Sequence, residues 1–174
     1  MDKSKKSKLW ISGGIPGLGK STWLQNHKDC FDNKAIIISR DKIRFSLLKD
    51  NEDYFSKETE VWNEYIKQIK DAINDKIPNI ILDATHLNQG SRAKVLRALG
   101  KSIKDVNEIN VIFFTGSLAT ALERNEKRSG REYVPPTQIY RMKTSIEIPS
   151  SIEKFDHIYL VNIDKSTITE RIGE

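Results

Sequence analysis

The stretch GGIPGLGKSTW, Gly13–Trp23, follows the short apolar run Leu9–Ile11 and decides the fold class. Within it, Gly14 to Ser21 has the spacing G-x-x-x-x-G-K-S, which is typical of a phosphate-binding loop. Glycines leave backbone N–H groups free to wrap phosphate oxygens, and a helix that begins near Gly19 adds the positive end of its dipole. The stretch therefore predicts a nucleoside triphosphate site between a strand and a helix.

The polar residues of this loop have separate predicted roles, with ATP and Mg²⁺ as the expected cofactors. Lys20 reaches the β- and γ-phosphates, and the Ser21 hydroxyl ligates Mg²⁺. The remaining phosphate contacts are expected from the loop backbone and the start of the helix, at Gly14, Gly17, Gly19 and Thr22.

Composition describes a polar globular chain of 174 residues, 37% hydrophobic and 30% charged, which fits one domain. No apolar run approaches the roughly 18 to 20 residues of a membrane span, so no membrane partner is expected. Cys30 is the single cysteine, which excludes an internal disulfide and favours a reducing, cytoplasmic setting. The net charge of +5 mildly favours a polyanionic partner. Nothing indicates an obligate protein partner.

The basic N-terminus, MDKSKKSK, has no hydrophobic region behind it and is not a signal peptide. We expect residues 1–7 to form a solvated tail and residues 8–174 to form a single domain.

Strand and helix signals alternate along that domain. This alternation predicts an α/β fold, with a parallel five-stranded sheet and helices on both faces. In such sheets, ligands bind at the carboxyl ends of the strands. The predicted strands are 8–12, 35–38, 80–82, 111–115 and 158–161. The predicted helices are 19–27, 41–49, 56–74, 89–99, 117–128, one starting at Pro135-Pro136, and a short polar helix closing the chain.

The motif SRDKIR, residues 39–44, follows the second predicted strand. Asp41 is a candidate general base that accepts a proton from an attacking hydroxyl. Arg44 lies three residues on, on the same side of a helix, and suits an anionic part of the acceptor. The alternative is that Asp41 is only a helix N-cap and Arg44 a surface charge.

The motif LDATHLN, residues 82–88, follows the third predicted strand. Asp83 at the end of an apolar run resembles a Walker B acid, which holds Mg²⁺. Thr85 and Asn88 add hydrogen-bonding groups that suit the substrate. We expect His86 to be packed or solvated rather than catalytic.

The cluster RNEKRSGR, residues 124–131, brings three arginines to a predicted helix end. Phosphoryl transfer needs positive charge on the migrating group, and arginine supplies it in planar, bidentate form. Arg124 and Arg128 share a helix face, and Arg131 follows in a Ser-Gly segment. The cluster predicts an arginine-rich lid over ATP, and the alternative is a solvated helix terminus.

Taken in order, GIPGLGKSTW, SRDKIR, LDATHLN and ERNEKRSGREYVP resemble the bacteriophage-type polynucleotide 5′-kinases, over about residues 8 to 150. The first motif is shared by many small P-loop kinases. The Arg-Asp-x-x-Arg element and Asp-x-Thr-x-Leu-Asn are more specific. The resemblance implies a P-loop kinase fold that transfers the γ-phosphate of ATP to the 5′-hydroxyl of DNA or RNA. The Asp-x-Asp motif of the family's appended 3′-phosphatase domain is not in this sequence.

The resemblance also implies residue roles. Asp41 would be the general base, Arg44 would contact the acceptor's phosphate, and Asp83 and Thr85 would line the acceptor side. Val134 lies where the family places an apolar residue against the terminal nucleotide. Arg128 would be the catalytic lid arginine, although the stretch from Arg128 to Val134 is slightly longer than in the family and leaves Arg131 as the alternative. Candidate stacking aromatics are Tyr54, Phe55 and Tyr133.

Two other functions remain open from the residues. A P-loop kinase of a small molecule, nucleoside or aminoacylated tRNA would use the same loop and the same acid. A nucleotide-binding switch or ATPase module would use the loop alone. The pairing of Asp41 with Arg44 favours an acceptor that carries an anion beside its hydroxyl.

Overall fold

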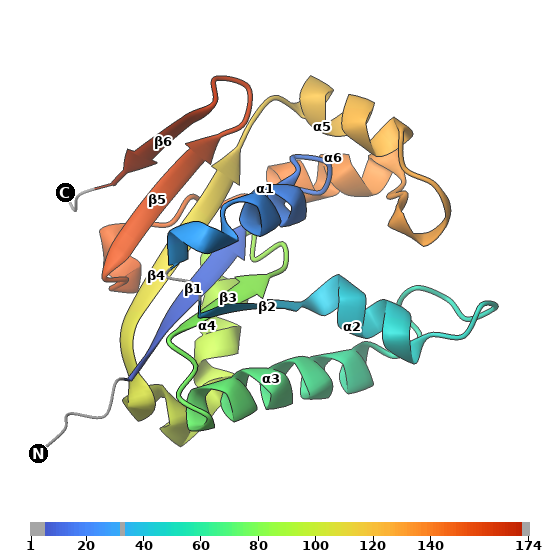
Figure 1. Ribbon diagram of the computed structural model, residues 1–174. Helices are drawn as coiled ribbons and strands as arrows, with labels where there is room; N and C mark the ends of the chain where they lie inside the picture. The colour runs from blue at the N-terminus through green and yellow to red at the C-terminus, as the bar shows by residue number, and fades with distance from the viewer. Residues whose placement is uncertain (1–5, 32–33, 172–174) are drawn as a thin grey trace, which may run out of the picture.

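The computed structural model describes residues 6–31 and 34–171, which form a six-stranded sheet flanked by helices (Figure 1). The strands lie in the order β2-β3-β1-β4-β5-β6. All neighbouring pairs are parallel except β5 and β6. The strands are β1 (Ser7–Gly13), β2 (Ala35–Ser39), β3 (Asn79–Asp83), β4 (Val106–Thr115), β5 (His157–Asn162) and β6 (Thr167–Glu170).

In the described part of the chain, six α-helices occupy the connections. Pro136 stands in the first turn of the last of them, where its missing N–H is harmless. They are α1 (Lys20–Asn26), α2 (Arg40–Leu47), α3 (Glu58–Asn74), α4 (Gln89–Leu99), α5 (Leu118–Glu126) and α6 (Pro136–Thr144). Short 3₁₀ helices are η1 (Lys28–Phe31), η2 (Gly100–Asp105), η3 (Gly130–Glu132) and η4 (Ser151–Glu153).

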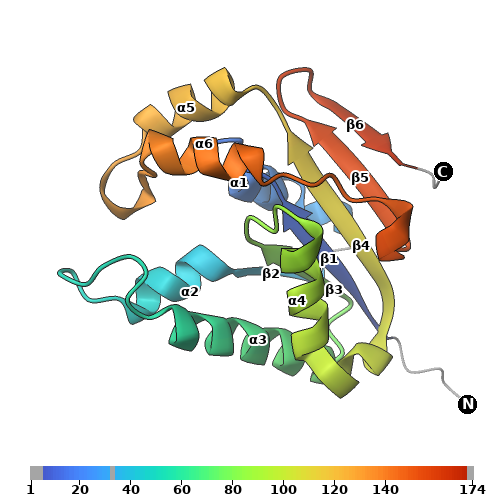
Figure 2. The same ribbon diagram turned by 180° about the vertical axis from the view of Figure 1, so that it is seen from behind.

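The sheet separates two hydrophobic clusters because its central strands are apolar on both faces. On β4, Val111 and Phe113 pack with α3 and α4, whereas Ile112 and Phe114 pack with α1, α5 and α6. Figures 1 and 2 show these helices on opposite sides of the sheet. The predicted layering, with helices on both faces, is confirmed.

The predicted sheet of five strands and the predicted closing helix are wrong. Residues 167–170 form β6, which pairs antiparallel with β5 after a tight turn in which Ser166 has φ +51°. The segment Thr167-Ile168-Thr169 is rich in β-branched side chains, which favour an extended backbone. Hydrogen-bonded pairing with the edge of β5 then stabilises the segment as a strand.

Parallel strands bring the three predicted site motifs to one edge of the sheet. Ser39 and Asp83 are register partners at the ends of β2 and β3, and Ile11 pairs with Leu82 two residues before β1 ends. The phosphate-binding loop, the Asp41 motif and the Asp83 motif therefore face one another.

Residues 1–5 of the predicted tail lie outside the described residues, and Ser7 already belongs to β1. Among the described helices, none has the length and apolar character needed to cross a membrane.

Candidate functional site

The phosphate-binding loop has the backbone that its glycines predict. Gly14, Gly17 and Gly19 have φ values of +137°, +87° and +79°, in the region that favours glycine. A Cβ at Gly17 would lie 2.2 Å from the carbonyl oxygen of Ala121, so α5 presses directly on the loop. The Gly14 N–H donates to the carbonyl oxygen of Thr85 at 2.8 Å, which ties the loop to the segment after β3.

Lys20 begins α1 and is buried under the loop. Its Nζ donates to the carbonyl oxygen of Ile15 at 3.0 Å, so the ammonium lies inside the loop that is expected to take the phosphates. Burial lowers the pKa of Lys20 to about 8, against the opposing attraction of Asp83 and Asp41. A phosphate entering the loop would restore the lost stabilisation of the charge.

The Ser21 hydroxyl donates to Asp83 Oδ2 at 2.7 Å, and Asp83 is buried at the end of β3. A hydroxyl and a carboxylate oxygen side by side form the hard-oxygen donor set that suits Mg²⁺, which completes its shell with waters and phosphate oxygens. Within residues 6–31 and 34–171, no group of three or more His, Cys, Asp or Glu side chains forms a separate metal site. The two predicted metal ligands are thus brought together and fit the ion.

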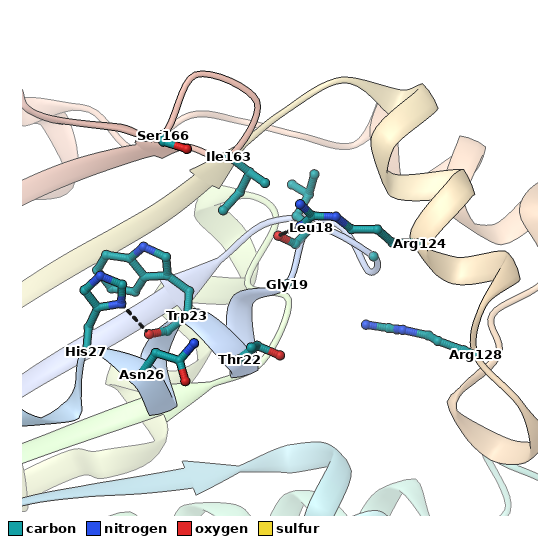
Figure 3. Close-up of a pocket in the computed structure, with 11 residues that line it drawn as sticks. Leu18, Gly19, Thr22, Trp23, Asn26, His27, Arg124, Arg128, Ile163 and Ser166 are labelled. Atoms are coloured by element: carbon teal, nitrogen blue, oxygen red, sulfur yellow. Dashed lines mark hydrogen bonds between the residues drawn. The ribbon is translucent and has the colours of Figure 1, made fainter.

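A cavity of about 500 Å³ opens beside the loop, between α1, α5 and the turn after β5 (Figure 3). Trp23 and His27 stack at its wall, with ring centroids 3.9 Å apart. Arg124 and Arg128 both line the cavity. The prediction that they share a helix face is wrong, because α5 ends at Glu126 and Arg128 follows it. Arg124 Nη1 also donates to the Leu18 carbonyl at 3.1 Å, which fixes its guanidinium against the loop. Thr22, Ile163 and Ser166 also line the cavity.

Arg131 does not line this cavity. Its guanidinium donates to the carbonyls of Leu48 and Lys49, beyond the end of α2. Figure 3 shows the Arg128 side chain extending into the cavity. The geometry therefore favours Arg128 over Arg131 as the arginine near ATP phosphates, and movement of the segment as a lid stays a prediction.

Val134 is held by a side chain that the sequence reasoning missed. The buried amide of Asn125 donates to the Val134 carbonyl at 2.7 Å and accepts from the Val134 N–H at 3.0 Å. The Val134 side chain is half-buried against the core cluster of α1, α5 and α6. This paired contact anchors the segment after η3, and its contact with a nucleotide stays a prediction.

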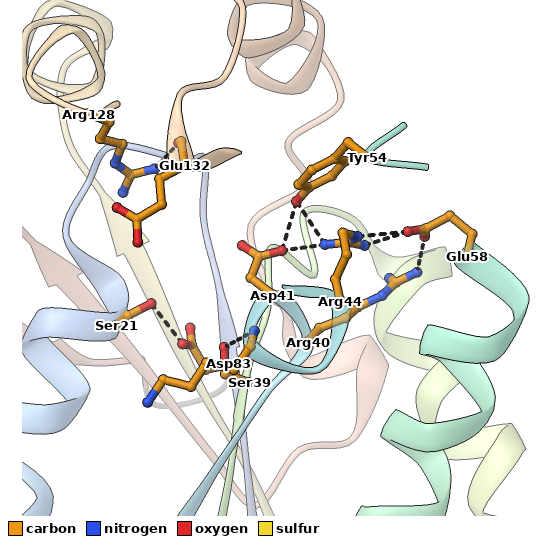
Figure 4. A network of polar contacts seen from close by, with 11 residues as sticks. Ser21, Ser39, Arg40, Asp41, Arg44, Tyr54, Glu58, Asp83, Arg128 and Glu132 are labelled. Atoms are coloured by element: carbon orange, nitrogen blue, oxygen red, sulfur yellow. Dashed lines mark hydrogen bonds and ion pairs between the residues drawn. The ribbon is translucent and has the colours of Figure 1, made fainter. Parts of the chain in front are cut away.

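Asp41 lies in the first turn of α2, but Ser39 is the N-cap, with its hydroxyl accepting from the Lys42 N–H. The interpretation of Asp41 as a simple cap is therefore excluded. Its side chain is 62% exposed, on the side of the site opposite Ser21 and Asp83 (Figure 4). A carboxylate in that place suits a base acting on an acceptor hydroxyl.

Arg44 is buried rather than a surface charge, and carboxylates neutralise it from two sides. Nη1 contacts Asp41, and Nε and Nη2 donate to Glu58 Oε1 at 2.9 and 2.6 Å. Tyr54 adds a hydroxyl that accepts from Nη1 at 2.7 Å. Four of the five guanidinium N–H groups are used inside the protein, which leaves little of the charge for an acceptor phosphate.

Tyr54 and Glu58 were not expected in this network. Tyr54 was a stacking candidate, but its ring is covered by the Arg44 guanidinium at 4.3 Å. Phe55 and Tyr133, the other stacking candidates, are exposed. No fixed spacing links Arg44 to a carboxylate in the next helix, so only the packing of α2 on α3 reveals Glu58.

After β3, Asn88 and His86 have side-chain partners within the protein, and substrate binding by Thr85 and Asn88 stays a prediction. The Asn88 side chain accepts from the Ser91 N–H at 2.9 Å as the N-cap of α4, and Thr85 is half-buried. His86 is buried, with Nδ1 2.7 Å from the Ser12 carbonyl, and burial lowers its pKa to about 4. Because a carbonyl only accepts, Nδ1 carries the proton of a neutral ring. His86 is packed, as expected.

The family model AAA_33, described as an AAA domain, matches residues 9–149. The chain belongs to this family. Its matched region contains the phosphate-binding loop, both acidic motifs and the arginine cluster, so this AAA_33 protein is a nucleotide-binding P-loop kinase-type protein. No curated protein sequence matches the chain.

Solved structures share the fold of this AAA_33 protein at low sequence identity. A gluconokinase from Sinorhizobium meliloti 1021 superposes with a TM-score of 0.56 at 14% identity, over 92% of this chain and 85% of that one. Kti12 from Chaetomium thermophilum, in complex with ADP-AlF3, superposes with a TM-score of 0.61 at 16% sequence identity, over 88% of each chain. A chain of the Pnkp1/Rnl/Hen1 RNA repair complex superposes with a TM-score of 0.63 at 19% sequence identity, over 99% of this chain and 51% of that one. These likenesses establish the fold and leave the acceptor open.

Proposed function

We propose that this protein transfers the γ-phosphate of ATP to a 5′-hydroxyl end of DNA or RNA. The observation that carries the phosphotransferase part is the placement of Asp41 across the site from the Ser21–Asp83 pair. The nucleic-acid part is supported by the order and spacing of the SRDKIR and LDATHLN motifs and by the likeness to a chain of an RNA repair complex.

In this mechanism the acceptor oxygen attacks the γ-phosphorus in line as the bond to the β-phosphate oxygen breaks. The hydroxyl proton passes to the Asp41 carboxylate, and ADP leaves. Lys20 moves its hydrogen bond from the Ile15 carbonyl to phosphate oxygens, and Arg124 and Arg128 add positive charge from the cavity side. Mg²⁺, held by Ser21 and Asp83, would neutralise charge on the phosphates.

A second candidate is a kinase of a small molecule, and the state of Arg44 favours it. Because Arg44 is enclosed by Asp41, Glu58 and Tyr54, it does not present a free guanidinium to an acceptor phosphate. The fold shared with a gluconokinase agrees with a compact acceptor that carries no phosphate. A third function, a nucleotide switch acting through a partner, has no specific observation in its favour.

The test uses γ-labelled ATP with Mg²⁺ and five acceptors: a 5′-hydroxyl DNA oligonucleotide, the matching RNA, a 3′-mononucleotide, a free nucleoside and a sugar acid. Label on the oligonucleotides is the expected result. Label only on the nucleoside or the sugar acid would refute the nucleic-acid acceptor and favour the second candidate.

Asp41→Asn should lower the transfer rate by about 10²- to 10⁴-fold while ATP still binds. Asp75→Asn, at the exposed far end of α3, is the matched control and should transfer normally. Normal transfer by Asp41→Asn would show that Asp41 is not the base.

A further inference from the structure

An aromatic hydroxyl contacts the candidate base directly. Tyr54, in the segment between α2 and α3, donates from its hydroxyl to Asp41 Oδ1 at 2.8 Å. Arg44 donates to the same oxygen. We propose that Tyr54 is a positioning residue for phosphoryl transfer, which fixes Asp41 Oδ1 so that Oδ2 faces the phosphate side of the site. This inference rests on the proposed function, because it assigns Tyr54 to the same base.

The two donors matter because the Asp41 carboxylate has little else to orient it. Its side chain is 62% exposed, and the terminal torsion of an aspartate is broad and roughly two-fold. Donors from Tyr54 and Arg44 reach a single oxygen from one side and restrict that rotation. Figure 4 shows the second oxygen turned away from both donors, toward the side where Ser21, Asp83 and Arg128 lie. That oxygen is the one available to an acceptor hydroxyl.

Tyr54 is itself held in place from several sides. The Arg44 guanidinium lies 4.3 Å from the centre of its ring and donates to its hydroxyl at 2.7 Å. The rings of Phe45 and Phe55 meet it edge-on, with centroids 6.2 and 4.8 Å away. Partial burial, with Asp41 nearby, raises the pKa of Tyr54, so the hydroxyl stays protonated and remains a donor.

The anchor of this arrangement lies in another helix. Glu58, at the start of α3, accepts from Arg44 through Oε1 and from Arg40 through Oε2 at 2.8 Å. Glu58 thereby orients the Arg44 guanidinium, which in turn contacts Asp41 and Tyr54. The position of the base thus depends on the packing of α2 against α3, although the base belongs to α2 alone.

The kinetic test is Tyr54→Phe, which removes the hydroxyl and leaves the ring under Arg44. We expect kcat to fall about 10- to 100-fold, because a misplaced base loses its near-attack geometry, while the KM values for ATP and acceptor stay near wild type. Tyr140→Phe removes the hydroxyl of an exposed tyrosine on α6, away from this network, and should change neither parameter. An unchanged kcat for Tyr54→Phe, or a raised acceptor KM alone, would overturn the positioning role.

A stability measurement tests the contact without any acceptor. In urea unfolding, residues that act through one hydrogen bond give non-additive losses. Asp41→Ala removes the acceptor of the Tyr54 hydroxyl, so Tyr54→Phe combined with Asp41→Ala should lose clearly less stability than the sum of the two single losses. Fully additive losses would overturn the proposal. The two proposals fail separately: wild-type protein that labels no 5′-hydroxyl end refutes the nucleic-acid function, whereas additive losses refute the role of Tyr54.

Discussion

Ser21 and Asp83 lie 62 residues apart in the chain, yet the serine hydroxyl donates to the aspartate at 2.7 Å. The contact joins the start of α1 to the end of β3. It exists because β1 and β3 are parallel neighbours whose carboxyl ends meet at one edge of the sheet. The pair places the two oxygens proposed to bind Mg²⁺ beside the phosphate-binding loop.

The buried ammonium of Lys20 predicts a pH limit on ATP capture. With a pKa of about 8, Lys20 is charged below that pH and loses its proton above it. Because kcat/KM reports the free enzyme, kcat/KM for ATP should fall as pH rises through about 8, to about a tenth by one pH unit higher. Steady-state kinetics from pH 6.5 to 9.5 measure this. In Lys20→Arg, kcat/KM for ATP, taken relative to that variant's own value at pH 6.5, should no longer fall as pH rises. An identical fall in both proteins would contradict the assignment of this pKa to Lys20.

Gly17 should not tolerate a side chain. Gly17→Ala places a methyl group 2.2 Å from the Ala121 carbonyl at φ +87°, so either the loop or α5 has to shift. We expect loss of ATP binding in calorimetry and a lowered unfolding temperature. Gly100→Ala, with φ +55° and nothing near its Cβ, tests strain alone and should cost about 1–2 kcal/mol with binding intact. Equal effects of the two substitutions would argue against the close contact.

Substitutions of Arg128 and Arg131 should have different effects on kcat. Arg128→Ala removes a cation that lines the nucleotide cavity and should lower kcat by about 10²-fold or more, since charge on the migrating phosphoryl group is lost. Arg131→Ala removes contacts to the Leu48 and Lys49 carbonyls and should leave kcat within about threefold of wild type. Transfer assays at saturating ATP measure both. The reverse ranking would make Arg131 the arginine that acts on ATP.

His86 should make stability depend on pH. Its pKa is about 4 in the fold and about 6.5 when unfolded, so the unfolded chain binds more protons between these values. Stability is therefore complete above pH 6.5 and falls toward pH 4, by about 3 kcal/mol from this ring. His86→Asn retains a donor for the Ser12 carbonyl but does not titrate. The stability gap between wild type and variant in urea unfolding should narrow on acidification, and a constant gap would contradict the burial argument.

Arg92 and Glu153 form an ion pair of which Arg92 is fully buried. Arg92 Nε and Nη2 donate to Glu153 at 2.8 and 2.6 Å, and Nη1 donates to the His86 carbonyl. Glu153→Gln leaves a buried cation without its counter-charge and should lower the free energy of unfolding by about 3–5 kcal/mol. Glu123→Gln breaks the exposed pair with Lys127 and should cost less than about 0.5 kcal/mol in the same urea titration.

Several parts of the site were predictable because their signals are local. The glycine spacing of the loop and the acid after each of two strands both depend on residues near one another in the chain. The closing helix was predicted wrongly, because the β-branched side chains around Ile168 favour an extended backbone and the segment forms β6. An edge strand of four residues depends on the partner it meets.

The sequence by itself predicted a phosphate-binding loop at Gly14–Ser21 and determined that Asp41 and Asp83 meet at the same sheet edge, since a parallel sheet aligns the ends of its strands. Only the tertiary structure decided which partners the arginines take. Arg44 is enclosed by Glu58 and Tyr54, while Arg131 turns to the end of α2. Side chains this long choose among several neighbours, and only the packing of separate segments determines which of them are within reach.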